Sequence, residues 1–193
     1  MLVAIDIGNT NILIGIIDSK GLIQNQHRIS TVDLLNKEKS TLIELDNIFN
    51  DLNSISDYNF IIASVVPEAC NHLNQKLKEI NVSANILSST DKVLGMKIDI
   101  DKPSELGTDR IVNAIAAVDE YKAPLVVIDF GTATTFDIID SDGTYKGGLI
   151  CPGIKLSIKS LNSDTAQLPS VDLKRTSTVI GRDTKSAIES GIY

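Results

Sequence analysis

Two short segments of the chain join a carboxylate, a glycine and small polar side chains in an order suited to phosphate binding. They are Asp6-Ile7-Gly8-Asn9-Thr10-Asn11 and Asp129-Phe130-Gly131-Thr132. Glycine has no Cβ, so its backbone can approach a ligand closely. Amide and hydroxyl groups on a tight turn can cradle a phosphate, and a nearby acid can hold a cation that neutralises its charge. The alternative interpretation is two ordinary hairpins whose Asn and Thr side chains only satisfy their own turns.

These two segments belong to an internal repeat. Each follows an apolar strand, and each precedes a second apolar run that ends in a polar turn, Asp18-Ser19-Lys20-Gly21 in one half and Asp140-Ser141-Asp142-Gly143 in the other. A repeat of a whole strand–turn–strand unit implies two similar lobes and not a short-period solenoid. Because the acid-and-glycine turn occurs once in each half, we favour two phosphate loops that face each other across a cleft.

The spacing of apolar residues predicts an α/β fold with mixed sheets flanked by helices. Besides the first hairpin, strands are predicted over 22–29, 59–66, 84–87, 125–130, 133–139 and 144–150, and helices over 41–52, 68–80, 111–119, 154–161 and 183–191. Lys122-Ala123-Pro124 suggests a boundary, so the lobes are predicted at 1–121 and 122–193. The second lobe has far fewer residues than the first for the same pattern, and we expect it to be incomplete.

Composition argues against several functional classes. The formal net charge is −7, and so acidic a surface repels nucleic acid and anionic membranes. No apolar run reaches the roughly 18 residues that a membrane helix needs. Two cysteines are too few for a disulfide framework or a cysteine-based zinc site. We therefore expect a cytoplasmic protein with no nucleic-acid or membrane partner.

Two further segments combine glycine with reactive or flexible positions. In Gly107-Thr108-Asp109-Arg110, the acid could accept a proton from a substrate hydroxyl and the arginine could bind an anion. A helix-capping acid beside a solvated arginine fits the spacing equally well, but the preceding glycine favours a site. Gly147–Gly153 either approaches a nucleotide closely or forms only a bulge and a helix entry. Cys151 within it is expected to be buried.

Taken in order, four motifs resemble the type III pantothenate kinase family. They are Asp6–Asn11, Gly107–Arg110, the run Asp129-Phe130-Gly131-Thr132-Ala133-Thr134-Thr135-Phe136-Asp137, and Gly147-Gly148 through Pro152-Gly153. The resemblance covers the whole chain. It implies the superfamily of acetate and sugar kinases, heat-shock chaperones and actin, with two ribonuclease H-like lobes and a nucleotide cleft between them. It also implies ATP-dependent phosphorylation of pantothenate, the first step of coenzyme A biosynthesis.

The resemblance assigns roles to individual residues. Asp109 is implied as the general base, and Asp129 as the acid that holds a monovalent cation, K⁺ or NH₄⁺. ATP contacts are implied at Asp6, Ile7, Gly8, Asn9, Thr10, Asn11, Ile12, Leu13, Gly131 and Thr132, with Asp6 on the side of a divalent cation such as Mg²⁺. Pantothenate contacts are implied at Ile100, Gly107, Thr108, Asp109, Arg110 and Thr184, the last across a homodimer interface.

One position departs from the family pattern. Ile100 stands three residues before Pro103, where the family usually has an aromatic side chain, so one wall of the pantothenate pocket differs. This leaves two alternatives, a nucleotide-binding regulator of the same fold with little or no catalysis, or another small-molecule kinase of the superfamily. The joint presence of Asp109, Arg110 and Asp129 favours an active kinase, because a non-catalytic module has little reason to keep all three.

Overall fold

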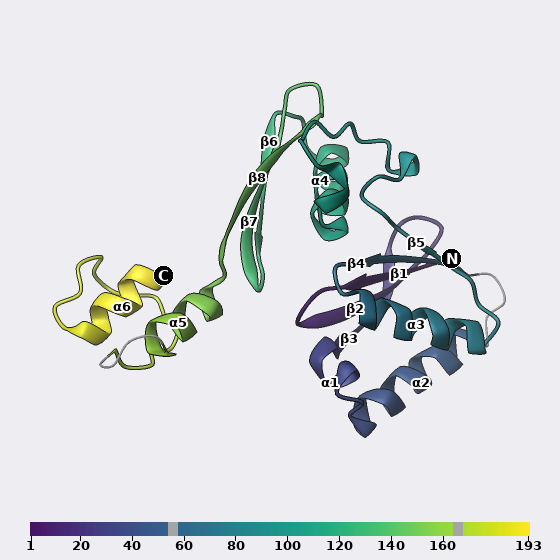
Figure 1. The fold of residues 1–193 in the computed structure, drawn as a ribbon, viewed down its shortest axis with the longest axis horizontal. Helices are drawn as coiled ribbons and strands as arrows, with labels where there is room; N and C mark the ends of the chain where they lie inside the picture. The colour runs from purple at the N-terminus through teal and green to yellow at the C-terminus, as the bar shows by residue number, and fades with distance from the viewer. Residues whose placement is uncertain (54–57, 164–167) are drawn as a thin grey trace. The chain divides into compact units, whose positions relative to one another are not determined.

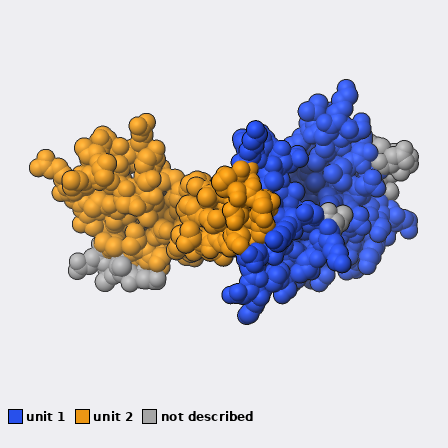
Figure 2. Space-filling model, turned by 90° about the horizontal axis from the view of Figure 1, so that it is seen from above, with its two compact units in different colours: residues 1–122 blue, residues 123–193 orange. Residues whose placement is uncertain are grey.

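The computed structural model describes residues 1–53, 58–163 and 168–193. They form two compact units, residues 1–122 and 123–193, which Figure 2 shows in blue and orange. Each unit contains one sheet, and helices precede or follow its strands along the chain (Figure 1). The predicted α/β architecture is therefore confirmed. No helix among the described residues is both long and apolar enough to span a bilayer.

Unit 1 is built on a five-stranded sheet in the order β3-β2-β1-β4-β5. Its strands are β1 (Leu2–Ile7), β2 (Asn11–Ile17), β3 (Ile23–Ser30), β4 (Asn59–Ser64) and β5 (Ala84–Ile86). The first three form an antiparallel meander, and β4 and β5 add in parallel on the other side of β1. Because β1 and β4 run in the same direction, their carboxyl ends meet at one edge of the sheet.

Helices bury the apolar side chains of this sheet. They are α1 (Thr31–Leu35), α2 (Lys39–Asn53), α3 (Pro67–Glu79) and α4 (Thr108–Glu120), with short 3-10 turns at Lys92–Leu94 and Pro103–Glu105. The residues Leu45, Ile48, Phe49 and Leu52 of α2 and Ala69, Leu73 and Leu77 of α3 keep helical spacing and are buried in the core. The helices predicted over 41–52, 68–80 and 111–119 are therefore confirmed.

The helix α1 was not predicted. It has only five residues and too few apolar positions to show a period. Its start is fixed locally, because the Ser30 side chain accepts a hydrogen bond of 3.2 Å from the Asp33 amide. The chain therefore continues from β3 directly into a short capped helix.

Unit 2 contains the three-stranded antiparallel sheet β6-β7-β8 and two helices. Its elements are β6 (Leu125–Phe130), β7 (Ala133–Ile139), β8 (Tyr145–Pro152), α5 (Ile154–Ser163) and α6 (Thr184–Ile192). Asp183 is the N-cap of α6, and its carboxylate accepts a hydrogen bond of 2.9 Å from the Ser186 amide, which lowers the pKa of Asp183. The strand predicted over 144–150 extends to Pro152.

The expectation for Cys151 is wrong, because its side chain is exposed. Cys151 lies on β8, which is an edge strand of its sheet. Leu149 and Ile150 on the same strand are also exposed. An edge strand has a neighbour on one side only, so an apolar sequence alone does not ensure burial.

Candidate functional site

The carboxyl edge of the unit 1 sheet brings together two of the predicted motifs. Ile7 at the end of β1 lies beside Ser64 at the end of β4, and the Val65 amide donates a hydrogen bond of 3.0 Å to the Ile7 carbonyl. The first hairpin turn leaves the sheet directly after Ile7, and α4 begins against the end of β4. In open α/β sheets, ligands bind at the carboxyl ends of strands.

The Thr108 side chain attaches the start of α4 to β4. Its hydroxyl donates to the Ser64 carbonyl at 2.9 Å and accepts from the Ser64 amide at 3.1 Å. Thr108 is 6% exposed, so this hydroxyl faces the sheet. The side chain that the resemblance assigns to substrate binding therefore fixes the position of its neighbour Asp109.

Asp109 lies in the first turn of α4, at the positive end of the helix dipole. Its Oδ1 accepts a hydrogen bond of 2.8 Å from the Arg110 amide, and both side chains are half-buried. Gly107, the N-cap of this helix, leaves the space that the carboxylate occupies. A Cβ added at Gly107 would overlap Asp109 Oδ1 and would lie 3.4 Å from a methyl group of Val65.

Replacing Gly107 with alanine is expected to displace the Asp109 carboxylate. The backbone of Gly107 has φ −61° and ψ 137°, which alanine adopts readily. The overlapping atom is the end of a rotatable side chain, so folding should lose only about 1 kcal/mol, as for loss of a favourable N-cap residue. A displacement of about 1 Å at a reacting group can cost about 100-fold in rate. Steady-state kinetics and thermal melting should show a large fall in kcat with a Tm lowered by only about 2 to 4 °C, and an unchanged kcat would contradict this role.

The first hairpin turn presents polar groups at the same edge. The Gly8 amide donates to the Asn11 carbonyl at 3.0 Å and closes the turn around Asn9 and Thr10, which are both exposed. Asp6 lies opposite Leu13 in the ladder and is exposed, on the face away from the buried Ile5 and Ile7. The exposed carboxylate and turn can therefore be reached from solvent.

The second hairpin in unit 2 repeats this arrangement. Asp129 is exposed on β6, and the Gly131 amide donates to the Ala133 carbonyl at 3.0 Å. The Gly153 amide donates to the Thr132 carbonyl at 3.1 Å. A Cβ at Gly153 would overlap the carbonyl oxygens of Gly131 and Thr132. The backbone of Gly153 therefore packs closely against this turn and holds it by a hydrogen bond.

The start of the segment Gly147–Gly153 forms an irregular part of β8. Gly147 has φ 103°, which L side chains rarely adopt, and the pairing of β7 with β8 shifts register between Asp137 and Ile139. This part of the segment is a bulge, one of the two interpretations that the sequence left open.

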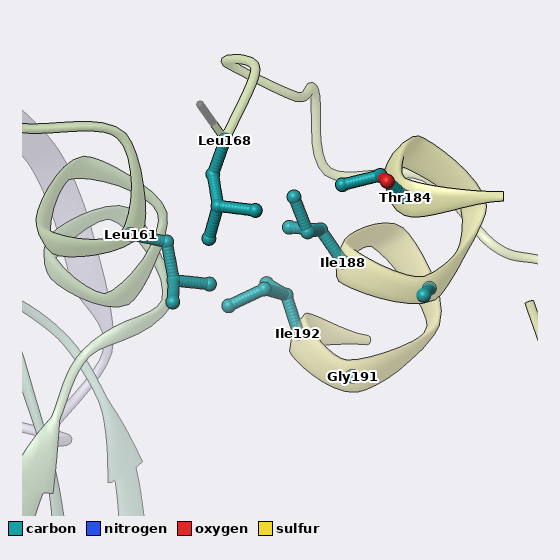
Figure 3. A pocket seen from close by; sticks show the side chains of 7 residues that line it. Leu161, Leu168, Thr184, Ile188, Gly191 and Ile192 are labelled. Atoms are coloured by element: carbon teal, nitrogen blue, oxygen red, sulfur yellow. The ribbon is translucent and has the colours of Figure 1, made fainter. Parts of the chain in front are cut away.

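Thr184 is the first residue of α6 in unit 2 and is exposed. It lines a cavity of about 500 Å³ between α5 and α6, shown in Figure 3. The other lining residues are Leu161, Leu168, Ala187, Ile188, Gly191 and Ile192. The cavity offers apolar contacts and one hydroxyl, so it suits an aliphatic group and not a phosphate.

The predicted site residues are divided between the two units. Asp6 to Leu13 and the segment Ile100 to Arg110 lie in unit 1, and Asp129, Gly131, Thr132 and Thr184 lie in unit 2. Ile100 is half-buried ahead of the turn at Pro103. Sequence reasoning missed two residues that hydrogen-bond to the motifs, Ser64 to Thr108 and Thr31 to Gly8 in the first turn. Ser64 carries no recognisable signal, whereas Thr31 stands where the repeat places Gly153.

Sequence reasoning also assigned no role to Asp137, the last residue of the motif that begins at Asp129. The carboxylate of Asp137 accepts a hydrogen bond of 2.5 Å from the Tyr145 hydroxyl, and both residues are buried. The bond ties β7 to β8 inside unit 2.

Comparison with known proteins gives consistent results. The family model for type III pantothenate kinase matches residues 2–193. The type III pantothenate kinase of Paramagnetospirillum magneticum is 43% identical over all of this chain and 75% of its own length, and that of Citrifermentans bemidjiense is 38% identical over all of this chain and 76% of its length. A solved Campylobacter jejuni protein described as a Baf family transcriptional activator has a TM-score of 0.53 at 20% identity, over 98% of this chain and 72% of its own. That last likeness supports the fold alone.

Proposed function

Because this chain belongs to the type III pantothenate kinase family, we propose how its residues carry out the family reaction. The chain is a kinase that phosphorylates pantothenate with ATP, in coenzyme A biosynthesis. The observation that carries the proposal is the shared edge of the unit 1 sheet, where the turn after Ile7 and the start of α4 are joined through Ser64 and Thr108. In this proposal the base on α4 and the phosphate turn after β1 share one edge of the sheet.

We assign the proton transfer to Asp109. Its carboxylate accepts the proton of the pantothenate hydroxyl as the oxygen attacks the γ-phosphorus of ATP, the bond to the bridging oxygen breaks, and ADP leaves. Phosphoryl transfer needs little covalent assistance beyond alignment, a base and stabilisation of charge. Arg110, next to the base, supplies a positive charge for the pantothenate carboxylate or for the transferred phosphoryl group.

The nucleotide is assigned to the two acid-and-glycine hairpins. In this proposal Asp6 to Leu13 in unit 1 and Gly131 and Thr132 in unit 2 contact the phosphates of ATP. The Asp6 carboxylate is exposed next to its turn, and its oxygens would hold a divalent cation such as Mg²⁺. When bound, that cation neutralises phosphate charge. The described residues contain no cluster of three or more His, Cys, Asp or Glu side chains that could hold a metal ion.

The pantothenate site is assigned to Ile100, Gly107, Thr108, Asp109 and Arg110, with Thr184 contributed by a second copy in a homodimer. Thr184 supports this because it is exposed beside an apolar cavity of its unit. The aliphatic part of pantothenate would occupy such a surface.

A direct assay tests the function. The purified chain is incubated with pantothenate and ATP, and mass spectrometry follows conversion of pantothenate to its phosphate ester. A panel of other hydroxylated acceptors tests for a different small-molecule kinase, and ATP binding without phosphorylation of any acceptor would support the regulator. Light scattering on the same sample distinguishes a monomer from the proposed homodimer.

We expect the reaction to require K⁺ or NH₄⁺, held by the exposed carboxylate of Asp129. A monovalent cation there offsets phosphate charge next to the second turn. Initial rates are measured in potassium, ammonium and sodium buffers of equal ionic strength. Asp129→Asn should remove the response to potassium, whereas Asp172→Asn, which neutralises another exposed acid of unit 2, should keep it. Equal rates in sodium and potassium would contradict the assignment.

A further inference from the structure

Thr31 contacts the first hairpin turn from the far side of the meander. It is the first residue of α1, directly after β3, and is 1% exposed. Its amide donates to the Thr10 carbonyl at 3.0 Å, and its hydroxyl donates to the Gly8 carbonyl at 2.7 Å. Both carbonyls on which it acts belong to the turn that the proposed function assigns to the phosphates of ATP.

These two bonds determine which way the peptide groups of the turn point. A trans peptide is planar, and its N–H points opposite to its C=O. The carbonyl of Gly8 and the amide of Asn9 share one peptide, as do the carbonyl of Thr10 and the amide of Asn11. Holding both carbonyls toward Thr31 therefore directs the amides of Asn9 and Asn11 away from it. Several N–H groups fixed in direction form a binding concavity for an anion.

The second hairpin contains the same support in a different form. Gly153 is the first residue after its third strand, and its amide donates to the Thr132 carbonyl at 3.1 Å. It occupies the position in the second repeat that Thr31 occupies in the first. At Gly153 the backbone of the turn occupies the space that a side chain would need. Only the first copy adds a side-chain hydroxyl, which holds a second carbonyl of the turn.

We propose that Thr31 is a positioning residue for ATP. Its hydroxyl fixes the Gly8 peptide so that the turn amides meet the phosphates without rearrangement. This inference rests on the proposed assignment of Asp6 to Leu13 to the nucleotide. A residue that only started α1 would affect stability and both substrates alike, whereas a positioning residue affects the nucleotide selectively.

The test compares Thr31→Val with Thr31→Ser. Valine keeps the shape and removes the hydroxyl, and serine keeps the hydroxyl and removes a methyl group. Loss of one hydrogen bond that orients a binding group should raise KM for ATP by about 3- to 10-fold. Thr31→Val should show this increase, whereas its KM for pantothenate should stay within about twofold of the wild-type value. Thr31→Ser should keep the wild-type KM for ATP. Tripolyphosphate serves as a competitive inhibitor against ATP, and its inhibition constant should rise in Thr31→Val by the same factor as KM for ATP.

Controls separate this effect from general damage. Thr41→Val changes another buried threonine of unit 1, on α2 and outside the site, and should leave KM for ATP unchanged. If Thr31→Val does not fold, Thr31→Ala asks the same question with a smaller side chain. A wild-type KM for ATP in either folded variant, or a serine variant as impaired as the valine variant, would overturn the proposal. Calorimetry of ATP binding needs no pantothenate, so it tests Thr31 even if the kinase assay fails.

Discussion

Replacing Asp109 with asparagine is expected to lower kcat by about 10²- to 10⁴-fold, the usual contribution of a general base. Asparagine has nearly the same shape, and its side-chain oxygen can still accept the hydrogen bond from the Arg110 amide. It cannot take the proton of the pantothenate hydroxyl. Because Asp109 is not assigned to the nucleotide, Kd for ATP should stay near the wild-type value. Stopped-time assays for kcat and calorimetry for ATP measure the two quantities separately.

Glu105→Gln provides the matched control for this substitution. Glu105 is an exposed acid of the same segment, paired with Lys102 at 2.8 Å on the surface. Its replacement also removes one negative charge, so it accounts for any change in the electrostatics of the segment. We expect kcat of Glu105→Gln to equal that of wild type. If Asp109→Asn retained near wild-type kcat, another group would be the base.

Replacing Gly153 with alanine should damage both folding and catalysis. The added methyl group would overlap the carbonyl oxygens of Gly131 and Thr132, which belong to the backbone and cannot rotate away. Overpacking of this kind costs about 1 to 3 kcal/mol, or roughly 2 to 4 °C in Tm per kcal/mol for a chain of this size. Because the turn must move, kcat/KM for ATP should fall by about 100-fold. Thermal melting and initial rates give the two values.

Gly15→Ala is the corresponding control. Gly15 lies inside β2, where a Cβ would meet only the Ala4 carbonyl at 3.9 Å, an ordinary contact. We expect this variant to keep the wild-type KM for ATP. A Gly153→Ala enzyme with native Tm and native kinetics would show that the turn of the second hairpin tolerates displacement, and that it does not need the support described above.

The comparison of Gly153→Ala with Gly107→Ala distinguishes two uses of glycine. At Gly107 the overlapping atom ends a rotatable side chain, so the expected loss is catalytic with little change in Tm. At Gly153 the overlapping atoms are backbone, so stability and activity should fall together. The sequence alone presents both positions only as glycines before a helix.

Much of the fold could be predicted from the sequence, because apolar periodicity reports which residues face a core. The helix α2 was predicted from Leu45, Ile48 and Phe49, which are buried at helical spacing. The five-residue α1 carried no such signal, and exposure of Cys151 followed from the place of its strand at the edge of a sheet. Position within a sheet depends on which strands pair, and no local pattern contains that information.

The sequence by itself determined the family, because acids, glycines and threonines occur in four ordered motifs and twice in one repeated unit. It also predicted which residues carry the chemistry. Only the tertiary structure decided what holds those residues in place. The bonds of Thr108 to Ser64 and of Thr31 to Gly8 join residues 44 and 23 positions apart in the chain. Such contacts exist only after β1, β2, β3 and β4 have paired in register. The reason is geometric, since a hydrogen bond needs its donor and acceptor within about 3 Å, and chain folding sets that distance.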